Sequence, residues 1–316
     1  MNEPLDRRGL AYGISAYSVW GFFPIFMALL IPAGALEIVA WRALSSLVVC
    51  LIIIAVMRVW RRLWRLVKDR DVMWRLAIAA LVITVNWGVM VYAVLTDRVA
   101  QTALGYYINP LITVALSIVF LGERLRRLQV VALSVAFAAV VVLAVEMGGI
   151  PWISLSLAVS FAIYSFVKKA VGHKVDALSG LTIETAIIAP AAIAVLTAVT
   201  LAGDATLFTR GASDLGALHD VLLLTTGTWT AGALLLFAAG ARRLPLNITG
   251  LLQYIAPTMQ FVLAVWYFRE PMPGARWAGF ALVWVALVLV TVDSWRARSR
   301  VTDVKAAESG EVTEPV

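Results

Sequence analysis

The sequence is poor in charged residues and in the side chains that hold metals. Only 14% of the residues are charged and 62% are hydrophobic, whereas about 25% of a typical soluble domain is charged. So few polar side chains cannot cover the surface of a soluble protein of this length, which excludes a soluble globular fold. The only cysteine, Cys50, lies in an apolar run. It cannot form an intrachain disulfide and is expected to pack as a small hydrophobe.

Motifs of cofactor chemistry are missing as well. The chain contains no P-loop, dinucleotide-binding glycine motif, HExxH segment or nucleophile elbow. With two histidines and one cysteine, a thiolate or His-rich metal site is not expected. We therefore predict a protein with no cofactor and no metal, which is neither an enzyme nor an ATP-driven pump.

Long apolar runs dominate the chain instead. The segments 43–57, 129–145 and 277–292 contain no charged side chain, and a membrane-spanning helix needs about 20 mostly apolar residues. Gly and Pro mark most of the junctions between such runs. We predict an all-α polytopic membrane protein with ten transmembrane helices, at about 11–30, 36–57, 72–95, 99–121, 127–145, 151–167, 177–201, 219–239, 245–268 and 275–293.

The positions of Lys and Arg predict the orientation. Of the 26 Lys and Arg residues, 21 fall on one side of the predicted membrane region, four fall on the other side, and Arg42 lies deeper within a span. Cytoplasmic loops carry the excess of Lys and Arg, so both termini are expected in the cytoplasm.

The basic segment 58–75 contains three Trp residues. It is expected to lie on anionic lipid of the bilayer and not to bind nucleic acid. Reading residues 10–30 as a signal peptide is a weaker alternative.

The second half of the chain repeats the first at a constant offset. A shift of 147 residues places the Tyr-Ile-x-Pro segment at 107–110 on the one at 254–257, and Glu37 on Glu184. Because each half would contain an odd number of spans, the second half is expected to be inverted relative to the first. Many secondary transporters are built in this way, with the substrate site near the bilayer midplane where the repeats meet.

The repeat also predicts the domain boundaries. We expect two homologous five-helix halves, 1–147 and 148–296, and a disordered cytoplasmic tail, 297–316. The tail ends in the polar stretch ESGEVTEPV, which has too few apolar residues to bury.

Four segments resemble a known family, namely EIVAWR (37–42), VNWG (85–88), ALGYYINPLITVALSIVFLGERLRRLQ (103–129) and LPLNITGLLQYIAPTMQFVLAV (244–265). Through these motifs the chain is similar to the RarD family of EamA-type permeases, in the drug/metabolite transporter superfamily. The resemblance covers nearly the whole membrane region. It implies ten helices in two EamA-like halves and a permease in the bacterial inner membrane.

The fourth and ninth predicted spans carry polar or small side chains at intervals of three or four residues, on one helical face. Equivalent faces of two repeats would line a shared cavity and hydrogen-bond a polar small-molecule substrate. We assign this role to Tyr106, Asn109, Gln253, Tyr254 and Gln260. Helix packing is the alternative, since small and hydroxyl residues are also enriched at helix contacts in membranes. Packing is the preferred interpretation for Thr102, Ser117 and Thr249.

Charge inside a membrane span is costly and usually functional, and three such residues stand out: Glu37, Arg42 and Glu184. Arg42 is predicted to bind an anionic or carbonyl group of the substrate through its planar guanidinium. Glu184 and Glu37 are assigned to coupling, with Glu184 as the proton carrier, because burial favours the protonated form of a carboxyl group. The alternative is a structural ion pair in which Glu37 or Glu184 neutralises Arg42.

Two prolines and two further residues complete the predicted site. Pro110 and Pro257 lie inside spans, where a proline removes a backbone hydrogen bond and kinks the helix. They are predicted to be paired hinges, with static kinks as the alternative. Asn86 and Trp87 of the third span are expected to line the same cavity, although packing or anchoring at the membrane interface also explains an aromatic residue there.

These features predict a secondary transporter that moves a small polar or amphipathic metabolite or drug by alternating access. Proton coupling and a homodimer are left open. The alternative is a membrane-embedded sensor or enzyme on the same scaffold. An intramembrane hydrolase needs paired acids on facing helices. Glu37 and Glu184 are expected towards opposite sides of the membrane, which disfavours this alternative.

Overall fold

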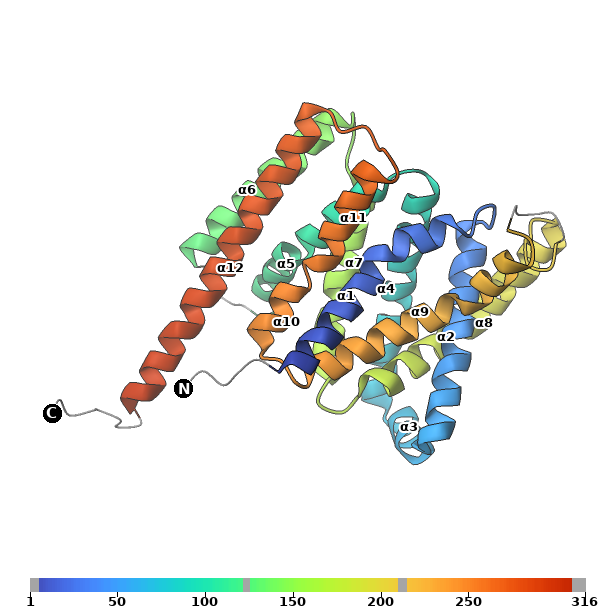
Figure 1. Cartoon of the computed structure of the whole chain (residues 1–316). Coiled ribbons are helices and arrows are strands. Elements are labelled where there is room, and N and C mark those ends of the chain that lie inside the picture. Colours follow the sequence, from blue (N-terminus) through green and yellow to red (C-terminus); the bar gives the residue numbers. More distant parts are fainter. Residues whose placement is uncertain (1–5, 122–125, 210–214, 309–316) are drawn as a thin grey trace. The chain divides into compact units, whose positions relative to one another are not determined.

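The computed structural model describes residues 6–121, 126–209 and 215–308; for 117–121, 246–247 and 294–308 it describes the backbone alone. The described residues form helices and connecting turns without a β-strand, which confirms the all-α prediction (Figure 1). The helices are α1 (Arg7–Ala28), α2 (Ala35–Met57), α3 (Trp60–Lys68), α4 (Arg70–Leu95), α5 (Val99–Leu121), α6 (Arg127–Glu146), α7 (Trp152–Val171), α8 (Ala177–Ala202), α9 (Ala217–Ala241), α10 (Leu246–Leu252), α11 (Ile255–Trp266) and α12 (Gly274–Glu308).

Nine helical segments of the described chain are long and apolar enough to cross a membrane. They coincide in position with all but one of the predicted spans. The remaining predicted span, 99–121, is helix α5, whose last side chains lie outside the described residues. The polytopic architecture is therefore confirmed, while the inverted repeat of ten spans stays a prediction.

Aspartates mark the starts of helices α4 and α8. Asp69 accepts a hydrogen bond from the backbone N–H of Val72 at 3.2 Å and one from Lys174 Nζ at 3.0 Å. The Lys174 hydrogen bond holds the pKa of the Asp69 carboxyl below its usual value. Asp176 caps α8 and pairs with Arg62 at 3.0 Å. Each carboxylate thus satisfies free N–H groups of a first helical turn and also ties two connecting segments together.

The ninth predicted span is interrupted in the structure. Helix α10 ends at Leu252 and α11 begins at Ile255. Pro257 lies in the first turn of α11, and a proline ring clashes with the carbonyl four residues earlier, here that of Gln253. The break therefore lies where the proline predicts a distortion. Pro110, by contrast, lies inside a continuous helix α5. The hinge role of both prolines stays a prediction.

The described residues group into two compact units, each of which takes segments from both predicted halves of the sequence. One unit consists of Met1–Tyr106 and Trp152–Pro271, and the other of Tyr107–Pro151 and Met272–Val316. The units are defined by spatial contacts and the repeat by sequence, so the predicted halves remain untested.

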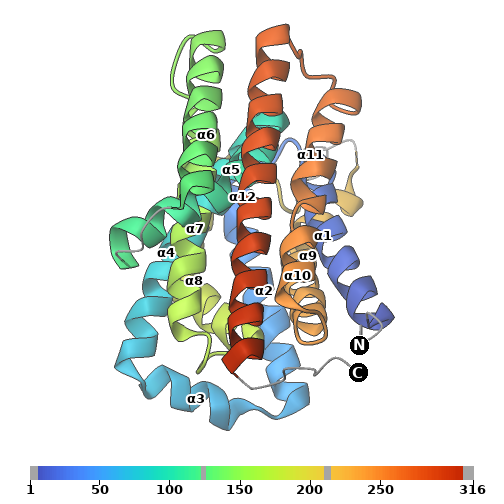
Figure 2. The ribbon, with the colours of Figure 1, turned by 90° about the vertical axis from the view of Figure 1, so that its left-hand side faces the viewer.

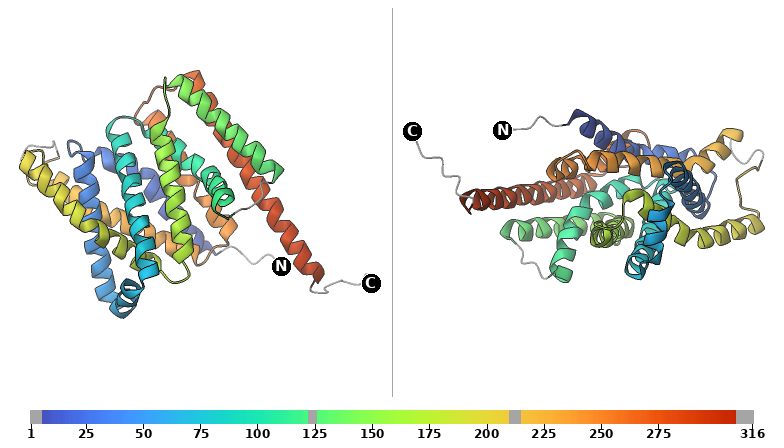
Figure 3. Two further views of the ribbon diagram at one scale, coloured as in Figure 1. Left: turned by 180° about the vertical axis from the view of Figure 1, so that it is seen from behind. Right: turned by 90° about the horizontal axis from the view of Figure 1, so that it is seen from below.

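In the larger unit, α2 packs against α8 and α9, α1 against α9 and α11, and α4 against α7 (Figure 3). Helices α2 and α9 are in close contact at Gly227, where a Cβ atom would lie 2.0 Å from the backbone nitrogen of Ser46. No side chain fits in that space, so glycine is required for this helix contact. These packed helices carry the charged residues of the predicted site.

In the smaller unit, α6 and α12 lie side by side (Figure 2). Arg276 and Glu146 form an ion pair at 3.0 Å at the C-terminal end of α6, and Arg126 and Asp293 form another at 3.2 Å at its N-terminal end. The helices touch between these pairs, since a Cβ at Gly279 would lie 2.5 Å from the Leu143 side chain.

Helix α12 is longer than expected. It continues to Glu308, so the predicted start of disorder at residue 297 does not hold for residues 297–308. This stretch, ARSRVTDVKAAE, contains no glycine or proline and many good helix formers, so it has no local signal to end a helix. Residues 309–316 lie outside the described residues.

Within the basic segment 58–75, residues Trp60–Lys68 form helix α3 where a loop is predicted, and α4 begins at Arg70. In α3 the side chains of Leu63 and Leu66 are buried, whereas Trp60 and Trp64 are exposed. An amphipathic helix of this kind suits a lipid headgroup region, and its lipid contact stays a prediction.

Candidate functional site

A buried guanidinium lies where four helices meet. Arg42 of α2 is only 5% exposed. Its Cζ atom lies 4.5 Å from the ring centroid of Phe23 in α1 and 4.2 Å from that of Trp87 in α4. Nε donates a hydrogen bond to Thr230 Oγ1 of α9 at 2.9 Å, whereas Nη1 has no hydrogen-bond partner among the described residues. Two predicted residues, Arg42 and Trp87, are thus brought together.

Asn86, next to Trp87 in α4, links three helices. Its Nδ2 donates to the Leu157 carbonyl at 3.1 Å and to Ser160 Oγ at 2.9 Å, both in α7. Its Oδ1 accepts from the Tyr106 hydroxyl of α5 at 3.2 Å. Tyr106 in turn lies within electrostatic reach of Arg42. The polar atoms of Asn86 are therefore engaged, and the residue holds the Tyr106 hydroxyl in place.

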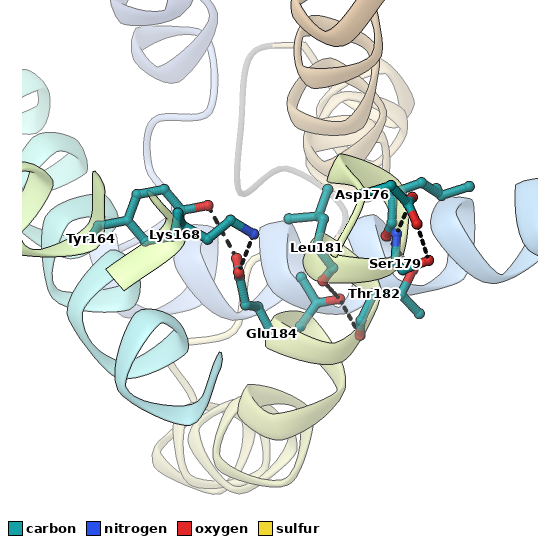
Figure 4. Close-up of polar contacts among 9 residues, drawn as sticks. Tyr164, Lys168, Asp176, Ser179, Leu181, Thr182 and Glu184 are labelled. Atoms are coloured by element: carbon teal, nitrogen blue, oxygen red, sulfur yellow. Dashed lines mark hydrogen bonds and ion pairs between the residues drawn. The ribbon is translucent and has the colours of Figure 1, made fainter. Parts of the chain in front are cut away.

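A second charged cluster surrounds Glu184 in α8 (Figure 4). The Glu184 carboxylate is 1% exposed, and its Oε1 lies 2.6 Å from Lys168 Nζ. Its Oε2 accepts a hydrogen bond from the Tyr164 hydroxyl at 3.2 Å. Tyr164 and Lys168 lie four residues apart in α7, so they share one helix face. The Lys168 side chain is 24% exposed, which leaves one side of the pair open to the surface.

The structure therefore corrects the alternative in which Glu184 neutralises Arg42. Glu184 pairs with Lys168, which the sequence places in a loop because the sixth span is predicted to end at residue 167. The helix α7 continues to Val171. Had the sixth span been predicted one helical turn longer, Lys168 would have lain within it and would have been a candidate partner for Glu184.

Glu37 has partners of its own, so its predicted alternative pairing with Arg42 is also wrong. Its Oε1 accepts from the backbone N–H of Thr206 at 2.9 Å, and its Oε2 accepts from the Thr206 hydroxyl at 3.0 Å. The same hydroxyl lies 3.0 Å from His219 Nε2. Because a hydroxyl has one hydrogen to donate, Nε2 must carry a hydrogen and donate it to Thr206. Sequence reasoning missed Thr206 and His219 entirely, since no local pattern connects them to Glu37.

Gln260 is the buried member of the polar stripe in the ninth span. Its side-chain nitrogen donates to the Trp20 carbonyl at 3.2 Å, and its side-chain oxygen accepts from the Thr102 hydroxyl at 3.1 Å. These hydrogen bonds join α11 to α1 and α5. The packing interpretation of Thr102 is consistent with this geometry.

The remaining predicted residues lie elsewhere. Gln253 is exposed and Tyr254 is half-buried, both at the break between α10 and α11. Asn109 is half-buried in the part of α5 that belongs to the smaller unit. Their substrate-binding roles stay predictions. Ser117 lies outside the residues whose side chains are described.

One open groove lies away from these polar residues. It has a volume of about 320 Å³ and lies between α2 and α8, lined by Trp41, Ile193, Leu196, Thr197, Thr200 and Leu201. None of its lining side chains is charged, so we do not assign it to a polar substrate.

In the part of the chain that the structure describes, no three His, Cys, Asp or Glu side chains are grouped as metal ligands would be.

Comparison with known proteins shows the family. The model of the EamA-like transporter family matches residues 7–145. A protein called RarD from Streptomyces exfoliatus is 44% identical over 298 residues, which is 94% of this chain and 92% of the relative. The chain belongs to the RarD-type EamA transporters.

Other relatives extend the same likeness. An uncharacterized transporter, YojE, of Bacillus subtilis is 37% identical over 95% of this chain and 99% of its own length. Protein RarD of Escherichia coli is 34% identical over 93% of this chain and 97% of its own. A solved crystal structure shares the fold with a TM-score of 0.56 at 20% identity, covering 92% of this chain and 98% of the other. The protein is therefore a multi-pass membrane transporter of the drug/metabolite superfamily.

Proposed function

We propose that this RarD-type transporter is a secondary carrier that moves a small polar or amphipathic metabolite or drug across the bacterial inner membrane by alternating access, coupled to protons. The observation that carries the proposal is the ion pair between Glu184 and Lys168, with Glu184 almost fully buried in a spanning helix. Charged residues at membrane depth are costly and usually mark a transport or proton pathway.

The pair provides a simple way to couple a proton to a conformational change. While Lys168 and Glu184 are in contact, the lysine stabilises the carboxylate, and the Tyr164 hydroxyl donates to its second oxygen. If α7 and α8 move apart in the other state, the carboxylate loses this partner and takes up a proton, because an isolated buried charge is unfavourable. Return of Lys168 releases the proton. One proton is bound and one released in each cycle.

The transport test uses purified protein in proteoliposomes and a panel of labelled solutes. The panel contains carboxylates, amines, neutral amides and chloramphenicol, the last because a relative in Pseudomonas aeruginosa is called chloramphenicol-sensitive protein RarD. A carrier that alternates access speeds up uptake when the vesicles are preloaded with the same solute. We expect this trans-stimulation for at least one solute class, relative to liposomes without protein.

Two outcomes would overturn the proposal. Uptake that is not stimulated by internal solute and does not saturate would indicate a channel. Absence of uptake of every solute on the panel, with correctly folded protein in the liposomes, would favour a sensor on the same scaffold.

A further inference from the structure

Arg42 presents an unusual charge balance. Guanidinium groups stay protonated in proteins, and Arg42 is buried where α1, α2, α4 and α9 meet. Burying one partner of an ion pair without the other costs several kcal/mol. Two aromatic rings face its Cζ atom, and each cation–π contact offsets roughly 0.5–2 kcal/mol of that cost. The rings accept no hydrogen bond from the plane of the guanidinium, so Nη1 remains without an acceptor.

The nearby acidic residues of the spans do not supply the missing negative charge. Glu37 accepts hydrogen bonds from Thr206, and Glu184 is held by Lys168 and Tyr164. No carboxylate of the described chain lies within ion-pair distance of Arg42. The described residues thus supply no counter-ion for Arg42, which leaves its charge to be neutralised by a group from outside the chain.

We infer that Arg42 binds the carboxylate of the transported solute, so that the substrate class is a small organic monocarboxylate. This inference deepens the proposed function and depends on it. The Thr230 hydroxyl occupies Nε, which leaves the two terminal nitrogens of the guanidinium as the pair that can bind two carboxylate oxygens in parallel. One guanidinium balances one negative charge, which favours a carboxylate over a phosphate that carries a second charge.

The surroundings indicate what the rest of the solute is like. One turn along α1 from Phe23, Phe26 packs against Trp229, which adjoins Thr230, with 4.8 Å between ring centroids. Aromatic surface therefore continues beyond the guanidinium on both α1 and α9. Aromatic side chains offer a large apolar area with specific ring geometry. An apolar, planar or aromatic body attached to the carboxylate fits this environment.

The first measurement compares the unfolding temperature of the protein with carboxylates and with the corresponding neutral amides. Purified protein in detergent is heated with acetate, benzoate, phenylacetate or octanoate, and in parallel with the corresponding amides. A ligand that binds the folded state raises the unfolding temperature by mass action. We expect at least one carboxylate to raise it in a concentration-dependent way, and its amide to leave it unchanged. Inorganic phosphate forms a separate arm, and stabilisation by phosphate but by none of the carboxylates would overturn the assignment.

Three variants locate the effect. Arg42→Gln removes the charge and should weaken carboxylate binding roughly thirtyfold or more. Arg42→Lys keeps a charge but loses the planar two-nitrogen geometry, so a smaller loss is expected. Arg75→Gln is the matched control, because Arg75 is a partly exposed residue whose ion pair is with Asp71 in the same helix. It should bind like the unchanged protein. If Arg42→Gln does not fold, the comparison of acids with amides on the unchanged protein still decides whether the protein binds a carboxylate.

Uptake in proteoliposomes separates failure of this inference from failure of the proposed function. Trans-stimulated uptake of amines or amides, with no carboxylate transported or bound, would leave a carrier but overturn the anionic substrate class. Transport of carboxylates that Arg42→Gln leaves unchanged would equally overturn the role of Arg42. If no solute of any class is taken up, the proposed function itself fails, whatever the binding measurement shows.

Discussion

Replacing Lys168 by methionine should destabilise the protein more than replacing Glu184 by glutamine, and the difference should depend on pH. In Lys168→Met the carboxylate of Glu184, which is 1% exposed, loses its counter-ion and cannot reach water. In Glu184→Gln the amine of Lys168 remains, and its side chain is 24% exposed. A long lysine side chain can extend its charged amine into water. Glu184→Gln therefore leaves no buried charge without a counter-ion.

The magnitudes follow from the least costly response of each variant. In Lys168→Met the carboxyl group can take up a proton. For a glutamic acid with an ordinary pKa of about 4.3, protonation costs about 3.7 kcal/mol at pH 7 and about 1 kcal/mol at pH 5. Glu184→Gln replaces the ion pair by a hydrogen bond from the charged amine to a neutral amide oxygen, at a cost of about 1 kcal/mol at either pH. The penalty of Lys168→Met therefore grows as the pH rises above the ordinary carboxyl pKa.

The assay is unfolding of the purified protein in detergent, by heat or by a denaturing detergent, at pH 7 and pH 5. The double variant, with both substitutions, serves as the control and should be close in stability to Glu184→Gln alone. Equal destabilisation by the two single variants at pH 7, or a Lys168→Met penalty that does not shrink at pH 5, would refute the assignment of a buried, charged pair.

Three further predictions use the same measurement of unfolding. Gly227→Ala should separate α2 from α9 and destabilise by about 1–3 kcal/mol, whereas Gly232→Ala in the same helix, where a Cβ has nothing within 4 Å, should be neutral or slightly stabilising. Thr206→Val leaves Glu37 and His219 without the shared hydroxyl and should cost about 1–3 kcal/mol, while Thr206→Ser should retain most of the stability. The lowered pKa of Asp69 means that its pair with Lys174 contributes stability above about pH 4 and loses it as the pH falls through the lowered value. Asp69→Asn, which keeps a capping side chain, should remove that acid-sensitive contribution, and an unchanged pH profile would contradict it.

The helices could be predicted from the sequence because each spanning segment carries its own signal. A run of about 20 apolar residues identifies a span wherever it lies in the fold, and Asp69 and Asp176 are recognisable as helix starts. The same is true of Pro257, whose effect on α10 and α11 is local and follows from its ring geometry. Burial of Arg42 was also predictable, since it follows directly from its position within an apolar run.

The partners of the charged residues could not be predicted in this way. Arg42 and Thr230 are 188 residues apart in sequence, and Glu37 and Thr206 are 169 apart. Which hydroxyl, amine or ring meets a buried charge depends on how helices cross, and helix periodicity does not contain that information. The repeat predicts equivalent positions for Glu37 and Glu184, yet one accepts hydrogen bonds from a connecting segment and the other pairs with a lysine of α7.

The end of α12 was not predicted either, for a different reason. Composition alone predicted disorder from residue 297, but a polar sequence without glycine or proline also continues a helix once one has been started. Sequence hydrophobicity reports whether a segment can be buried, and it does not report where a helix stops.

Proton coupling is tested by accumulation of a transported solute in proteoliposomes under an imposed pH gradient, for the unchanged protein and for Glu184→Gln. Exchange of labelled for unlabelled solute without a gradient is measured in parallel. We expect the unchanged protein to accumulate solute against the solute's own gradient, and Glu184→Gln to exchange solute without accumulating it. Full accumulation by Glu184→Gln would contradict proton coupling through the Glu184–Lys168 pair.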